Sequence, residues 1–154
     1  MRMISWRASN TGPHGQARKQ GGKTQTFTFL GFQHYCGHTR NGYFKVKRRT
    51  CGKRMKRELA EFAEWARKAR GRMRKGELIR AAIRKLKGHV SYYGITDNGT
   101  RVGTFLYRAS RILFKWLNRA SQRKSYTWDR FRQALAMYGW PEQVVRVSPN
   151  PFAR

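Results

Sequence analysis

The stretch Thr-Phe-Thr-Phe-Leu-Gly-Phe-Gln-His-Tyr at 26–35 is where the chain begins to specify a fold. Its β-branched and aromatic residues alternate with a period of two, which is typical of a half-buried strand. Arg-Asn-Gly at 40–42 follows, and Asn-Gly tolerates the positive φ that a tight hairpin turn requires. Residues 43–50 predict the returning strand. We therefore expect 24–52 to form an antiparallel β-hairpin.

Four helices are expected after the hairpin, because apolar residues recur there at spacings of three and four. The first begins near Lys53, the second spans 76–88 and the third, the longest, spans 101–120. Thr127 can cap the last helix, which ends near Gly139. The expected fold class is mainly α with a small N-terminal β-hairpin (α+β), in which a helical bundle follows the hairpin. The residues expected to face the core are Met55, Leu59, Phe62, Ala66 and Ala69 in the first helix, Leu78, Ile79, Ala82, Ile83 and Leu86 in the second, Phe105, Ala109, Ile112, Leu113, Trp116 and Ala120 in the third, and Trp128, Phe131, Leu135 and Tyr138 in the last.

The composition is strongly basic, with 35 Lys and Arg against seven Asp and Glu in 154 residues, a net charge of +28. So much like charge on a compact chain repels itself, and a polyanion that neutralises it is therefore the expected partner. The acids are scattered, with no cluster that could hold the ions of two-metal phosphoryl transfer. The apolar runs are too short to span a bilayer and no signal peptide is evident, so a cytoplasmic location is expected. Attachment to an anionic lipid surface is the alternative that the charge leaves open.

Basic residues gather in three runs that could follow a phosphate backbone. One lies on the returning strand, one opens the first helix, and one forms a stripe along the third helix. Tyr92 and Tyr93 could stack on bases or ribose, or they could fill the core instead. The candidate nucleic-acid-binding residues are Lys45, Lys47, Arg48, Arg49, Lys53, Arg54, Lys56, Arg57, Tyr92, Tyr93, Arg108, Arg111, Lys115, Arg119, Arg123 and Lys124.

Catalytic and metal sites find little support in the sequence. His34, Cys36 and His38 would share one face of a strand, but successive positions splay too far apart for easy tetrahedral closure, even with Cys51 nearby. Cys51 lies among bases that would depress its pKa, but no partner His and carboxylate are identifiable, so both Cys are expected to be ordinary thiols. Gly-Gly-Lys-Thr at 21–24 precedes a strand and lacks the first glycine of a phosphate-binding loop. We expect no catalytic residue, metal or cofactor in this chain.

Six segments occur in an order that is more specific than any one of them: TFTFLGF (26–32), HYCG (34–37), FKVKRRT (44–50), GHVSYYG (88–94), FKWLNR (114–119) and SYTWDRF (125–131). Together they resemble the C-terminal part of bacterial group II intron-encoded proteins, reverse transcriptases that also act as maturases. The resemblance covers about 22–141. It implies that Phe-Leu-Gly-Phe at 29–32 closes the last palm strands, with Gly31 allowing close backbone approach. The later helices would form the thumb and the maturase domain X.

The resemblance also divides the chain. It implies a palm-derived hairpin at 24–52, thumb helices at 53–88 and domain X at 89–141. Residues 1–23 are rich in Gly, Ser, Asn, Gln and bases with little apolar periodicity, so a flexible basic arm is expected there, and 142–154 are expected to form a tail. The family's Tyr-x-Asp-Asp catalytic turn is absent, since no Asp-Asp occurs in the chain. The polymerase site and its Mg²⁺ would therefore belong to a missing palm. A truncated product is expected: a remnant gene, an internal start or a cut chain.

The expected function is to clamp structured group II intron RNA in support of splicing, without a polymerase site. A template–primer duplex is a second candidate partner, and no membrane partner is expected. One alternative is half of a split reverse transcriptase that needs a separate palm and fingers fragment. Another is a generic basic RNA-binding or ribosome-associated protein.

Overall fold

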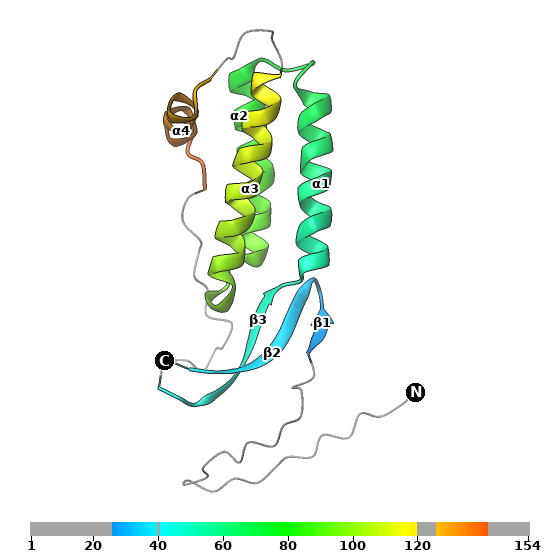
Figure 1. The fold of residues 1–154 in the computed structure, drawn as a ribbon, viewed down its shortest axis with the longest axis vertical. Coiled ribbons are helices and arrows are strands. Elements are labelled where there is room, and N and C mark those ends of the chain that lie inside the picture. Colours follow the sequence, from blue (N-terminus) through cyan, green and yellow to red (C-terminus); the bar gives the residue numbers. More distant parts are fainter. Residues whose placement is uncertain (1–25, 40, 120–125, 142–154) are drawn as a thin grey trace, which may run out of the picture.

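The described part of the chain, in a computed structural model, comprises residues 26–39, 41–119 and 126–141. A small antiparallel sheet lies at one end of a bundle of helices (Figure 1). Its strands are β1 (Phe27–Phe29), β2 (Phe32–His38) and β3 (Phe44–Thr50), in the order β1-β2-β3. The predicted fold class, mainly α with a small N-terminal sheet, is confirmed. Within the described ranges, no helix has both the length and the apolar character needed to cross a bilayer.

The predicted strand at 26–35 is in fact two strands. Leu30 and Gly31 form a turn between β1 and β2, and both have positive φ (48° and 82°). Positive φ at both central residues matches the twist of a two-residue hairpin. The sequence hid this turn because leucine rarely adopts a positive φ. The β2–β3 hairpin has the predicted Asn-Gly turn, and Gly42 has φ 81°.

The helices form an up–down–up bundle (Figure 1). α1 (Gly52–Ala69) leads away from the sheet, α2 (Lys75–Tyr93) returns, and α3 (Gly99–Asn118) leads away again after a 3₁₀ turn at Thr96–Asn98. α4 (Trp128–Met137) packs at the far end, and the Thr127 side chain accepts a hydrogen bond from the Arg130 amide as expected of an N-cap. α1 and α3 therefore run parallel, with both C-termini far from the sheet.

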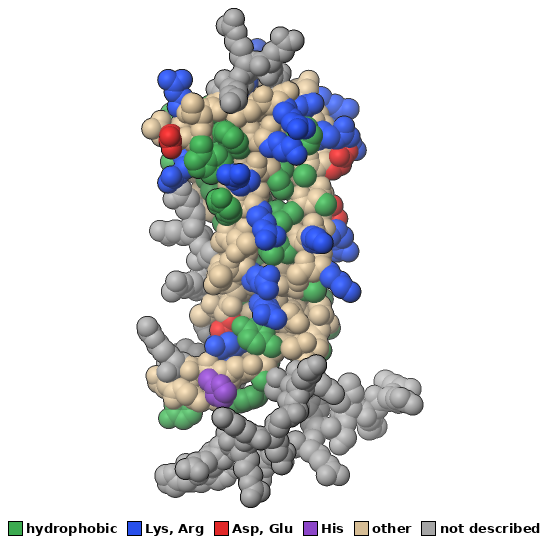
Figure 2. Space-filling model, viewed as in Figure 1, with side chains coloured by type: hydrophobic (Ala, Val, Ile, Leu, Met, Phe, Trp, Pro, Cys, Tyr) green, Lys and Arg blue, Asp and Glu red, His purple; other side chains and the backbone are tan. Residues whose placement is uncertain are grey.

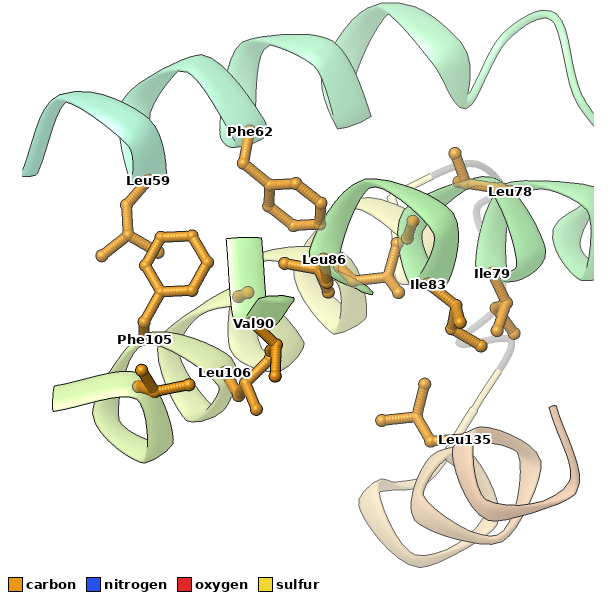
Figure 3. Packing of buried hydrophobic residues seen from close by; sticks show 14 of the residues in the cluster. Leu59, Phe62, Leu78, Ile79, Ile83, Leu86, Val90, Phe105, Leu106 and Leu135 are labelled. Carbon is orange, nitrogen blue, oxygen red and sulfur yellow. The ribbon is translucent and has the colours of Figure 1, made fainter. Parts of the chain in front are cut away.

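The core lies between the helices (Figure 3). It continues to Phe32 at the sheet. Every residue predicted to be buried in α1 and α2 is buried, and so are Phe131 and Leu135 in α4. Trp128 and Tyr138 pack against this core while remaining partly exposed. The spacing rule thus located the core faces of α1, α2 and α4. The core cluster consists of Phe32, Met55, Leu59, Phe62, Ala69, Leu78, Ile79, Ala82, Ile83, Leu86, Val90, Tyr93, Val102, Phe105, Leu106, Ala109, Leu113, Leu117, Phe131 and Leu135.

Two predictions about the helices were wrong. α2 does not end at Gly88 but continues to Tyr93, because Val90 and Tyr93 add a further buried turn. The boundary expected between 88 and 89 thus falls inside α2, and one core joins the segments on either side. In α3, Ile112 and Trp116 are only partly buried, while Val102, Leu106 and Leu117 fill the core; Ala120 lies outside the described residues. The stripe is therefore centred on a neighbouring face of α3.

Asn98 joins the sheet to the bundle. Its side chain is fully buried, accepts a hydrogen bond from the Thr50 amide (2.7 Å), and donates to Thr50 Oγ1 (2.7 Å) and to the Tyr93 carbonyl (2.9 Å). These bonds satisfy polar groups that would otherwise be buried without partners. They fix the end of β3 against the turn that leads into α3.

Candidate nucleic-acid interface

The two faces of the sheet differ in chemistry. Residues paired across an antiparallel ladder project to the same face, so Lys45, Lys47 and Arg49 share a face with Gln33 and Tyr35. The opposite face carries exposed aromatic and aliphatic residues: Phe27, Phe29, Phe44 and Val46, which are 49–67% exposed. Arg48 belongs to this second face, beside His34.

The cations of the basic sheet face differ in availability. Lys45 Nζ pairs with Asp97 Oδ1 at 3.1 Å. Arg49 donates to Gln33 Oε1 (3.0 Å) and lies 4.9 Å above the centre of the Tyr35 ring. Lys47 has no ion pair among the described residues. This face can therefore present a fixed guanidinium and a free ammonium to a phosphate backbone.

The bases of α1 are largely neutralised by glutamates of the same helix. Arg54 Nε lies 2.5 Å from Glu58 Oε1, and Arg57 pairs with Glu61 at 3.8 Å. Glu64 pairs with Arg67 (2.7 Å) and Lys68 (3.4 Å), and the hydrogen bonds from Arg67 lower the pKa of Glu64 to about 2. Among the predicted contacts on α1, only Lys53 and Lys56 are exposed without an ion pair in the described part of the chain.

The bases of α3 have a different setting, because the sequence of this helix contains no acid. The predicted stripe of Arg108, Arg111, Lys115 and Arg119 is exposed throughout. Three of its cations lie over tryptophan rings: Arg111 is 5.3 Å from the Trp128 ring centre, and Lys115 and Arg119 are 5.6 and 5.5 Å from that of Trp116. Figure 2 shows lysine and arginine side chains following the length of the bundle on the face where α3 lies. The stripe stands free of carboxylates among the described residues.

The two tyrosines divide between surface and core. Tyr92 is 52% exposed, and its hydroxyl donates to the Leu30 carbonyl at 3.0 Å, so its ring is available for stacking. Tyr93 is 3% exposed and packs against Phe32 and His89, so it cannot reach a base and is not a candidate contact. Arg123 and Lys124 lie outside the described residues.

A groove of about 630 Å³ opens beside Tyr92, between the β1–β2 turn, α1 and α2. Glu58 lies at the wall of this groove, and its carboxylate accepts hydrogen bonds from three groups: Arg54 Nε, His89 Nδ1 at 2.7 Å and the Tyr93 hydroxyl at 3.5 Å. Burial lowers the pKa of His89 and, together with the charge of Glu58, raises the pKa of Tyr93. The neutral imidazole donates Nδ1–H to Glu58 and stacks on Phe105, with ring centres 3.6 Å apart.

His89 Nε2 is buried without a hydrogen-bond partner among the described residues. This buried nitrogen has no described partner to which it could pass a proton. The network around Glu58 therefore holds the helices and the β1–β2 turn together, and we assign it no catalytic step.

The described residues form neither a metal-binding cluster nor an activated nucleophile. No group of three or more His, Cys, Asp or Glu side chains within these ranges could hold a metal ion. His34 stacks on Phe27 (4.6 Å between ring centres), while Cys51 lies beyond the sheet as the N-cap residue of α1. Backbone amides of Arg54 and Lys53 lower the Cys51 pKa, and none of the groups that shift it within the described ranges is an imidazole.

Sequence reasoning missed several cations that the structure brings to the surface or near it. The most informative is Arg70 at the end of α1, whose Cζ lies 4.9 Å from the Trp116 ring centre and whose Nη1 donates to the Arg119 carbonyl at 3.0 Å. No local pattern could reveal it, because its partners are on another helix. Arg80, Arg84 and Lys87 form a further exposed basic row on α2, and their spacing of four and three was visible in the sequence.

Comparisons of the chain with protein-family models, with curated proteins and with solved structures found no match. The resemblance to group II intron-encoded proteins therefore stays a prediction, and the functional argument depends on the geometry described above.

Proposed function

We propose that this chain is an RNA-binding protein that clamps structured RNA, as the thumb and maturase portion of a group II intron reverse transcriptase would. The carboxylate-free stripe of α3 is the observation that supports the proposal. A row of exposed cations on a rigid helix can follow a phosphate backbone without first breaking internal ion pairs. Lys47, Lys53, Lys56 and the ring of Tyr92 extend the contact surface toward the sheet.

The mechanism has no covalent step. Cations of α3 and of the sheet replace the counterions condensed on the RNA, and the release of these ions drives binding. The ordered core keeps the cations at fixed spacings, so an RNA of matching shape is held better than a flexible one. Binding in this way would stabilise the folded form of an intron.

Salt dependence tests the proposal directly. Neutralising about six to ten phosphates predicts that affinity falls on the order of 1,000-fold or more between about 50 and 200 mM salt. Filter binding of a folded group II intron domain would measure this fall, and bulk tRNA is the competitor. A flat salt response would contradict electrostatic clamping, and equal affinity for tRNA would instead support a generic RNA binder.

The apolar face of the sheet favours a second candidate, half of a split reverse transcriptase. Exposed Phe27, Phe29 and Phe44 form a surface that a separate palm fragment could cover. Primer extension by the chain together with a palm and fingers fragment tests this candidate. Extension that requires both components would support it, and no extension by the mixture would exclude it.

A further inference from the structure

The parallel helices α1 and α3 end together, and a cluster of cations surrounds one ring at that end. Arg70, Lys115 and Arg119 all lie within 4.9–5.6 Å of the Trp116 ring centre. We call these four residues the Trp116 cluster. Arg70 also ties the two helix ends together through its hydrogen bond to the Arg119 carbonyl.

The cluster holds more positive charge than its surroundings offset. Each helix C-terminus carries roughly half a negative charge, so the ends of α1 and α3 together offset about one of the three cations. No described carboxylate pairs with any of them, and Glu64, the nearest acid along α1, already binds Arg67 and Lys68. Helix capping therefore explains only part of the cluster, and an anion would relieve the remaining repulsion.

We infer that the Trp116 cluster is a phosphodiester-binding site, at which the ring holds three cations in position for backbone phosphates. This inference deepens the proposed function and depends on it. Cation–π contacts of this kind order a side chain before a ligand arrives, which removes part of the entropy cost of binding. Arg111, held over Trp128 at 5.3 Å, continues the same row along α3. Four residues of α-helix rise about 6 Å, so successive cations can meet successive phosphates.

The decisive variant changes no charge. Trp116→Leu removes the ring while leaving all three cations, and we expect RNA affinity to fall about three- to tenfold because the cations lose their support. Trp116→Phe keeps a smaller ring and should lose about twofold or less. The probe is a short RNA hairpin, with circular dichroism and thermal melting as checks of folding. Binding by a folded Trp116→Leu variant at the wild-type affinity would overturn the inference.

A matched pair of charge variants gives an independent test that does not alter Trp116. Arg70→Gln and Arg72→Gln each remove one charge, but Arg72 is exposed in the loop after α1 and has no ion pair or ring contact among the described residues. Arg70→Gln should weaken binding at least about threefold more than Arg72→Gln and reduce the salt slope by about one. Equal losses of RNA affinity in the two variants would show that the cluster contributes only as general surface charge.

A DNA hairpin of the same sequence identifies the chemistry that the cluster recognises. Equal effects of the variants on RNA and DNA are expected, because both present phosphodiesters; an effect confined to one would overturn that assignment. Absence of salt-dependent RNA binding by the wild type would refute the proposed function itself. If the wild type binds RNA in a salt-dependent way but the cluster variants bind as well as their controls, only the inference about the Trp116 cluster is refuted.

Discussion

Helices α1 and α3 lie side by side and run in the same direction, but their bases have different partners. α1 has six bases and three acids, and its arginines are engaged by Glu58, Glu61 and Glu64. α3 has four bases and no acid, and its cations lie over tryptophan rings or project into solvent. The number of basic residues alone would favour α1 as the proposed polyanion-binding helix. The absence of competing carboxylates favours α3 instead.

Matched double variants should give the largest difference between the helices. Arg108→Gln with Lys115→Gln removes two cations of α3 that have no ion pair among the described residues, while Arg57→Gln with Arg67→Gln removes two ion-paired cations of α1. We expect the α3 variant to lose on the order of tenfold or more in RNA affinity and about two units of salt slope. The α1 variant should lose less than about threefold, since its cations are already engaged. Titrations over a salt series measure both, and similar losses in the two variants would remove the distinction between the helices.

Removing acids from α1 should make it resemble α3. Glu61→Gln with Glu64→Gln frees Arg57, Arg67 and Lys68, and we expect RNA affinity to rise about threefold with a steeper salt slope. Asp129→Asn is the control, because it removes an exposed acid that has no ion pair among the described residues. If RNA affinity rises no more per removed acid than in this control, the ion pairs within α1 do not limit its contribution to RNA binding.

The smallest expected effect concerns the buried side of α1, where Glu58 accepts His89 Nδ1–H. Burial lowers the pKa of His89 in the folded state below its ordinary value of 6.5, so the unfolded chain takes up a proton more readily. The free energy of unfolding should therefore decrease as the pH falls from about 7 to 5, and this contribution should be constant above that range. Thermal melts across this range should show a weaker pH dependence in His89→Phe, which has no imidazole to protonate. If His89→Phe shows the same pH dependence of stability as the wild type, that dependence comes from other titrating groups.

Local periodicity was enough to predict much of this structure. The apolar stripe of α1 was predicted residue by residue, and Arg54–Glu58 and Arg57–Glu61 have the i,i+4 spacing from which ion pairs can be anticipated. The prediction from the sequence considered the bases of α1 but not the glutamates that pair with them. It therefore treated α1 and α3 as equivalent candidates for nucleic-acid contact. The information that separates them was present in the sequence.

Other features depended on contacts between distant segments, which periodicity does not carry. Trp116 has helical spacing to Leu113 and Ala109, but its burial depends on what the neighbouring helix places beside it, and α1 ends there with Arg70. Asn98 follows Asp97 in a typical turn sequence, and only the approach of Thr50 makes it a buried hydrogen-bonding residue. The candidate site was therefore predicted along α3 but not where α3 meets α1.

The turn between β1 and β2 limits which substitutions the chain can tolerate. Gly31 has φ 82°, and a Cβ at this position would lie 2.6 Å from the Tyr93 hydroxyl oxygen. Gly42 has almost the same φ, but no atom lies within 4 Å of the corresponding Cβ position. In a library randomised at both positions and selected for folding, Asn and Asp should survive at 42, because they adopt positive φ more readily than other side chains. At 31 only glycine should survive, since any other residue would displace Tyr93 from the core.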